Sequence, residues 1–108
     1  MSQSTFLPDI AAALPDIPTD SIISRTVVKN DDMDVIVFGF APGETLSEHT
    51  SSRPAMLHFL KGEATVTLGE ETHTAVAGAV AALPPHLPHS ITAHTETIML
   101  LIMMKTGP

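Results

Sequence analysis

Short strand-like runs, each closed by a turn signal, fill the chain from residue 21 onward. The runs are rich in Val, Ile and Thr, which favour extended backbone, and Gly, Pro and Asn between them favour turns. Repeated runs at this nearly regular spacing predict an all-β sandwich or barrel. We expect eight or so strands, with the sequences IISRTVVK, MDVIVFGF, AMLHFL, EATVTL, THTAV, AVAAL, SITAH and TIMLLIMM.

The segment before these strands has a helical pattern instead. Phe6, Ile10 and Leu14 recur every four residues and would form one apolar face of a short helix over residues 8–14. A proline stands at the start of this stretch, where helices tolerate it, and a second proline ends it. We therefore predict an N-terminal arm over residues 1–20 that contains a short helical segment.

Two of the strands differ in their side-chain pattern. The run EATVTL alternates, so we expect Ala64, Val66 and Leu68 to face the interior and the threonines to face water. The run TIMLLIMM is apolar on both faces, and we assign Leu100 to the interior and Leu101 to the outer face. The N-terminal arm, a second subunit or both should cover that outer face. We therefore expect a homodimer, which Leu101→Asp should disrupt.

Composition excludes several classes of partner. The formal net charge is −7, with only five Lys and Arg residues, which argues against nucleic acid and anionic membranes. The absence of cysteine removes disulfides, thiolate metal ligands and thiol nucleophiles. The N-terminus lacks a signal-peptide pattern, and the longest apolar run is too short for a membrane helix. We expect a soluble, cytoplasmic protein that takes a small-molecule ligand.

Two histidines stand in the proline-rich stretch PPHLPHS. Five residues separate Gly78 from Pro84, and four more precede His89, a spacing that resembles the second signature motif of the cupin superfamily. Upstream, Gly43 and five further residues precede His49, which resembles the start of the first cupin motif. The prolines then form a rigid turn that presents His89 to the barrel interior.

The resemblance covers residues 35–104 and implies a fold. Cupins are small double-stranded β-helix (jelly-roll) barrels, so the chain resembles a small RmlC-like cupin in one domain over residues 1–108. A chain of this length suits one domain and one core. We expect a cupin barrel over residues 35–104 with the arm packed against it.

The metal-binding pattern of the family is incomplete in this chain. In metal-binding cupins, two histidines and a glutamate of the first motif join the histidine of the second. His49 and His89 fill two of these positions, whereas Ser51 and Ala55 stand at the others. His86 replaces the glycine of the second motif, and histidine tolerates the left-handed backbone that such a position often demands.

The resemblance therefore implies a degenerate metal site on His49 and His89, with His86 as a further candidate at the cavity mouth. One divalent ion (Zn, Ni, Fe or Mn) would bind weakly there, because open catalytic sites normally supply three protein ligands. The two histidines are also the candidate catalytic residues of a weak-metal-site oxygenase or isomerase. The alternatives are a metal-free ligand-binding or sensor protein and a structural dimeric barrel. Whether the protein is an enzyme stays open at this point.

Residues near the motifs suggest what the cavity binds. Arg53 lies in a loop that borders the cavity by the resemblance, where it would pair with a carboxylate or phosphate of a ligand; the alternative is a surface arginine that balances Glu44 or Glu48. Ser51 would add a polar group. The predicted lining is otherwise apolar and suits a small ligand with one polar end: Val37, Leu57, Phe59, Leu83 and Leu100.

Overall fold

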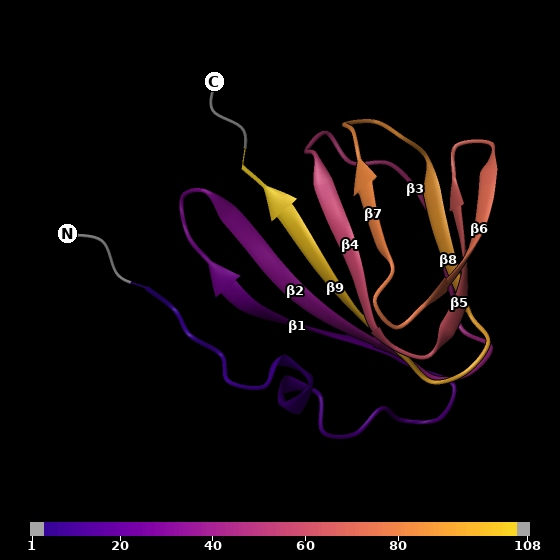
Figure 1. The fold of residues 1–108 in the computed structure, drawn as a ribbon, viewed down its shortest axis with the longest axis horizontal. Coiled ribbons are helices and arrows are strands. Elements are labelled where there is room, and N and C mark those ends of the chain that lie inside the picture. The colour runs from indigo at the N-terminus through magenta and orange to yellow at the C-terminus, as the bar shows by residue number, and fades with distance from the viewer. Residues whose placement is uncertain (1–3, 106–108) are drawn as a thin grey trace.

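The computed structural model describes residues 4–105, and nearly all of its regular structure is strand (Figure 1). A short 3-10 helix, η1, precedes the strands. The elements are η1 (Ile10–Ala13), β1 (Ile22–Lys29), β2 (Met33–Phe40), β3 (Thr45–His49), β4 (Ala55–Lys61), β5 (Glu63–Leu68), β6 (Glu71–Val76), β7 (Val80–Leu83), β8 (His89–Ala93) and β9 (Thr97–Met104).

The strands form two antiparallel sheets that face each other. One sheet has the order β1-β2-β9-β4-β7 and the other has the order β3-β8-β5-β6, so neighbours in space are seldom neighbours in sequence. This arrangement is a jelly roll, and it confirms the predicted all-β fold. The predicted helical segment is also present, but it is shorter than expected and of the 3-10 type, because it spans Ile10–Ala13 alone.

The strand that sequence patterning missed is β3, with the sequence TLSEH. Four of its five residues are exposed, so it carries no alternation of apolar and polar side chains. The other eight strands coincide with the eight predicted runs within a residue or two. The missed strand is the one that carries His49.

The main core lies between the two sheets. Phe40, Leu57, Ile91 and Met99 are at most 1% exposed there, and each comes from a different strand. Val66 of β5 joins them at 2% exposure, which confirms that the apolar positions of EATVTL face inward. Burial of these large apolar side chains is the main source of stability for a fold of this kind.

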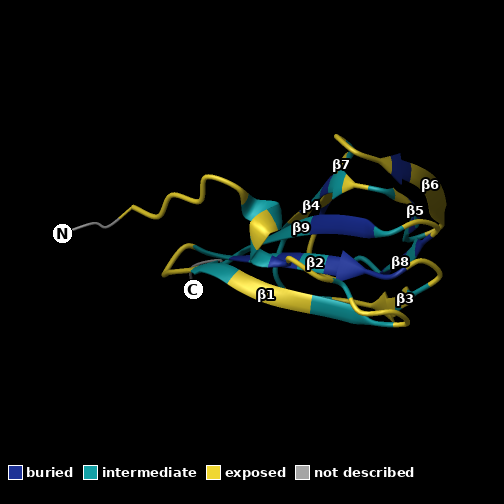
Figure 2. Ribbon diagram, turned by 90° about the horizontal axis from the view of Figure 1, so that it is seen from below, coloured by how far each residue is buried: buried dark blue, intermediate teal, exposed yellow. Residues whose placement is uncertain are grey.

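A second apolar cluster lies on the outer face of the five-stranded sheet, where the N-terminal arm covers it (Figure 2). Leu14 of the arm packs on Val37 of β2 and Ile98 of β9, with Leu100 at the edge of the cluster. The arm thus covers part of the outer face, which was one of the coverings predicted from the sequence. The assignment of β9 side chains was wrong, because Leu100 faces the arm and Leu101 packs on the main core.

Gly39 lets the arm lie close to the sheet. A Cβ atom at this position would lie 2.7 Å from Cδ1 of Ile17 and 3.1 Å from Cδ1 of Leu14. No side chain larger than hydrogen fits there unless the arm shifts. Within residues 4–105, no helix has the length and apolar character needed to cross a membrane.

Candidate functional site

A cavity of about 240 Å³ opens between the sheets at one end of the barrel. Its wall comes from the end of β3, the β3–β4 loop, the turn before β8 and the end of β9. We call it the histidine pocket. Its polar lining residues are His49, Thr50, Ser51, Arg53 and His89, and Leu83, Leu87, Leu101 and Met103 are among its apolar ones.

Two histidines lie side by side in this pocket. His49 and His89 are direct partners in the β3–β8 register, and their ring centroids are 4.2 Å apart. A register shift makes this possible, because β3 advances three residues from Leu46 to His49 while β8 advances two from Ile91 to His89. The extra residue is a β-bulge. Strict alternation from Leu46 would have turned Glu48 inward and His49 outward.

Backbone carbonyls fix the protonation pattern of both rings. Nδ1 of His49 lies 2.8 Å from the carbonyl oxygen of Ser47, and Nδ1 of His89 lies 2.8 Å from that of Leu87. A carbonyl oxygen can only accept, so each Nδ1 carries the hydrogen and donates it. In the neutral ring, Nε2 is then a hydrogen-bond acceptor. Neither Nε2 atom has a hydrogen-bond partner within the part of the chain that the structure describes.

The donor set around the pair does not fit a resident metal ion. A histidine that donates through one nitrogen to a carbonyl and keeps the other free is the usual form of a metal ligand. Nevertheless, residues 4–105 bring together no group of three His, Cys, Asp or Glu side chains. Ser51 and Ala55 line the pocket instead of the histidine and glutamate of metal-binding cupins. Two imidazoles fall short of the three protein ligands that open sites use.

Arg53 lines the pocket, and its guanidinium ties strand ends together. Nε donates to the carbonyl oxygen of Met104 at 2.8 Å, and Nη2 donates to that of Met103 at 3.3 Å. Nη2 also donates to Oδ2 of Asp34 at 3.0 Å, and Nζ of Lys105 lies 3.4 Å from Oδ1 of the same carboxylate. We call Arg53, Asp34 and Lys105 the strand-end clasp. The carboxylate partner is therefore Asp34, and neither Glu44 nor Glu48 as the sequence suggested.

The strand-end clasp lowers the pKa of Asp34. The hydrogen bond from Arg53 is the largest influence on the pKa of Asp34 and lowers it. Burial acts in the opposite direction, and the charge and hydrogen bond of Lys105 lower the pKa further. The net effect is a carboxyl group whose pKa lies below its ordinary value of 3.8.

Ser51 completes the polar side of the histidine pocket. Its Oγ accepts a hydrogen bond from the backbone N–H of Arg53 at 3.1 Å. The hydroxyl hydrogen of Ser51 is therefore free to be donated to a ligand. The carbonyl of Ser51 also accepts a hydrogen bond from the backbone N–H of His86 at 2.6 Å, which joins the β3–β4 loop to the turn before β8.

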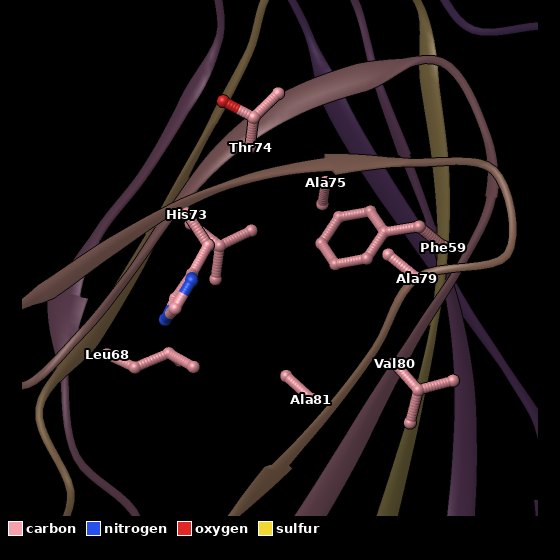
Figure 3. Close-up of a pocket in the computed structure, with 9 residues that line it drawn as sticks. Phe59, Leu68, His73, Thr74, Ala75, Ala79, Val80 and Ala81 are labelled. Atoms are coloured by element: carbon pink, nitrogen blue, oxygen red, sulfur yellow. The ribbon is translucent and has the colours of Figure 1, made fainter.

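The structure places several predicted site residues elsewhere. Leu57 is 1% exposed and belongs to the main core. Phe59 lines a second cavity, between β6 and β7 (Figure 3). His86 is exposed with a φ of 68°, so it occupies the left-handed conformation of the glycine that it replaces, and it does not line the histidine pocket.

The predicted cavity lining was wrong for Val37 and Leu100. Both belong to the cluster under the N-terminal arm, on the far side of the five-stranded sheet. Leu101 lines the histidine pocket in place of Leu100. The physical reason is that β2 and β9 both carry apolar side chains on both faces, so hydrophobicity does not show which face is inside.

The sequence profile of the family described as Cupin domain matches residues 36–105. The chain belongs to the cupin family. Oligomers and small-molecule ligands are common among cupins, and many hold a metal ion. No curated protein matches this cupin in sequence.

Solved structures of proteins from other organisms are similar to this cupin over most or all of its length. A conserved protein of unknown function from Streptococcus pyogenes, SPY1581, is 29% identical, with a TM-score of 0.83 and coverage of 100% of this chain and 93% of that one. A cupin superfamily protein from Desulfitobacterium hafniense, DSY2733, is 25% identical, with a TM-score of 0.84 and coverage of 98% and 95%. An RmlC-like cupin from Shewanella frigidimarina shares the fold at 19% identity, with a TM-score of 0.76 and coverage of 84% and 81%.

Proposed function

We propose that this cupin binds a small, partly apolar molecule that carries hydroxyl groups, and that it does so without a resident metal ion. The observation that carries this proposal is the pair of free Nε2 acceptors on His49 and His89, fixed by the two backbone carbonyls. A hydroxyl group can donate to one of these nitrogens and accept from Ser51. An ionised carboxylate can only accept hydrogen bonds, so it could not form one with the Nε2 acceptor of either neutral imidazole.

The apolar wall sets the size and the nature of the rest of the ligand. Leu83, Leu87 and Leu101 surround the polar side with hydrocarbon. At about 240 Å³, the pocket is smaller than the roughly 300–1,000 Å³ of sites for drug-sized ligands. A single saturated ring with two adjacent hydroxyl groups matches this combination of size and chemistry.

The test compares two probes that share one ring. cis-Cyclohexane-1,2-diol should shift the amide signals of His89 and Leu101 in a saturable NMR titration at pH 8, and cyclohexanecarboxylate should bind more weakly. In the His49→Ala, His89→Ala double variant, the affinity for the diol should fall at least about fivefold, since two hydrogen bonds are lost. His94→Ala, which removes an exposed histidine outside the pocket, is the control. Unchanged diol affinity in the double variant would overturn the proposal.

The weak-metal-site oxygenase or isomerase is the second candidate. The observation in its favour is that both imidazoles already have the tautomer that metal-ligating histidines adopt. It requires further ligands that the described residues do not supply. Elemental analysis of freshly purified, untagged protein separates the two candidates, because a stoichiometric transition metal would favour the enzyme.

We also propose that the protein is a two-fold homodimer through the outer face of the five-stranded sheet. The arm covers part of this face, and Met56 on β4 remains 36% exposed. Ile102, its register partner on β9, is also incompletely buried. A second copy would cover this apolar surface by the same patch on both subunits.

A further inference from the structure

A second cavity lies on the seam between the two sheets, away from the histidine pocket. β6 is the edge strand of one sheet and β7 is the edge strand of the other. The cavity between them has a volume of about 210 Å³ and shares no lining residue with the histidine pocket. We call it the seam pocket; Figure 3 shows its lining, which includes Phe59, Val66, Leu68, His73, Ala75 and Ala81.

Small side chains create this space. Ala75 on β6 and Ala81 on β7 face the seam from opposite edges, and Ala79 stands beside them. Phe59, which is 1% exposed, closes the inner end. The three short alanine side chains leave a hollow that opens to the surface, because Val80 and His73 at its rim are exposed. The cavity follows from the residue choice at these three positions.

Two polar residues line this largely apolar space, His73 and Thr74. In Figure 3, the His73 imidazole and the Phe59 ring lie at opposite ends of the seam pocket. Nε2 of His73 lies 3.2 Å from Oε1 of Glu71. An ionised carboxylate can only accept, so Nε2 carries the hydrogen, and Nδ1 of the neutral ring is an acceptor. The acceptor nitrogen of His73 is thus Nδ1, whereas the acceptor nitrogen of His49 and His89 is Nε2.

We propose that the seam pocket binds a single-ring aromatic molecule whose hydroxyl or N–H group donates a hydrogen bond to Nδ1 of His73. An apolar cavity of about 150 Å³ can hold benzene, so a volume of about 210 Å³ accommodates one substituted ring. Leu68, Ala75 and Ala81 would surround that ring with hydrocarbon, and Phe59, at 1% exposure, closes the floor beneath it. The site is separate from the histidine pocket, and the proposal does not depend on the function assigned there.

Phenol and toluene test the inference, because they have nearly the same shape and phenol alone has a donor. Phenol should shift the methyl signals of Leu68, Ala75 and Ala81 in a saturable titration by ¹H–¹³C NMR. Toluene should bind the same site about fivefold more weakly, as expected for the loss of one hydrogen bond. Phenol shifts confined to Leu83 and Leu101 of the histidine pocket would overturn the proposal.

Two variants locate the site and separate its parts. Ala81→Leu should fill the cavity and abolish phenol binding, with circular dichroism as the check of folding. His73→Leu should reduce phenol affinity about fivefold, to the level of toluene. Because His73 is exposed, this variant should fold and still tests the proposal if Ala81→Leu does not fold. His94→Leu is the matched control. In the His49→Ala, His89→Ala variant, which lacks the acceptors of the histidine pocket, phenol should still shift the methyl signals of Ala75 and Ala81 with the affinity seen in the parent. Full phenol affinity in His73→Leu would overturn the hydrogen bond to the imidazole.

Discussion

Nδ1 of His49 and Nδ1 of His89 each donate to the carbonyl two residues earlier in the chain, and the two rings lie 4.2 Å apart between centroids. Two adjacent acceptors result, because both Nε2 atoms lack hydrogen in the neutral state. A group that donates a hydrogen bond can satisfy either of these nitrogens. Under the proposed function, the histidine pocket should therefore favour ligands that donate hydrogen bonds.

The tautomers themselves can be observed. Long-range ¹H–¹⁵N spectra at pH 8 should show His49 and His89 with hydrogen on Nδ1, because a backbone carbonyl accepts from each. His73 should show the opposite form, with hydrogen on Nε2, because that atom faces the carboxylate of Glu71. This difference within one spectrum is the internal control. Hydrogen on Nε2 of either pocket histidine would contradict the proposed pattern of acceptors.

The strand-end clasp predicts a loss of stability in acid. The pKa of Asp34 is lower in the folded protein than its ordinary value of 3.8, chiefly because of the hydrogen bond from Arg53. The ionised form is therefore stabilised by folding, and this contribution is present above the unfolded pKa and lost as pH falls through the folded pKa. The difference in melting temperature between the parent and Asp34→Asn should be largest near neutral pH and should shrink below about pH 4.

Asp31→Asn is the control for this experiment. Asp31 lies near Asp34 in sequence but is exposed and outside the clasp. Its substitution should cause a small shift in melting temperature that is the same at every pH. Surface substitutions away from specific contacts usually change the free energy of unfolding by no more than about 0.5 kcal/mol. Equal pH profiles for the two variants would show that the clasp does not contribute to acid stability.

The fold was predictable because turn signals and strand propensity agree along most of the chain. Glycine, proline and asparagine separate the runs, and the alternation of Ala64 and Val66 places β5 correctly. β3 carries no such pattern, since most of its residues are exposed. Its bulge, which brings His49 next to His89, also cannot be predicted from the alternation of side chains along a strand.

Other features of the site depend on contacts between distant residues. Asp34 and Arg53 are brought together by the pairing of β2 with β9 and of β4 with β9. No local pattern predicts such a pair. The orientation of Leu100 and Leu101 depends on which face the arm covers, and the hydrophobicity of β9 is the same on both faces. The seam pocket did leave a signal, namely inward-facing alanines at positions 75 and 81.

Close packing of the arm on the sheet predicts the effect of Gly39→Ala. The added methyl group would lie 2.7 Å from Cδ1 of Ile17, so the arm must shift. Overpacking of this kind should cost about 1 kcal/mol, which corresponds to a decrease in melting temperature of about 4–8 °C. Limited proteolysis should also cleave the arm faster. Ile17→Ala in the same chain should restore resistance relative to Gly39→Ala alone; if it does not, the contact with Ile17 is not the cause.

The proposed homodimer predicts different outcomes for charges on the two faces of the five-stranded sheet. Met56→Glu places a charge at an exposed position of the outer face, so it should give a monomer by light scattering while the melting temperature of the barrel changes little. Val76→Glu, at an exposed position on β6 of the other sheet, should leave the dimer intact. Leu101→Asp should instead destabilise the barrel itself, because Leu101 packs on the main core and lines the histidine pocket. A parent protein that is monomeric at micromolar concentration, or a Met56→Glu variant that remains a dimer, would contradict this interface.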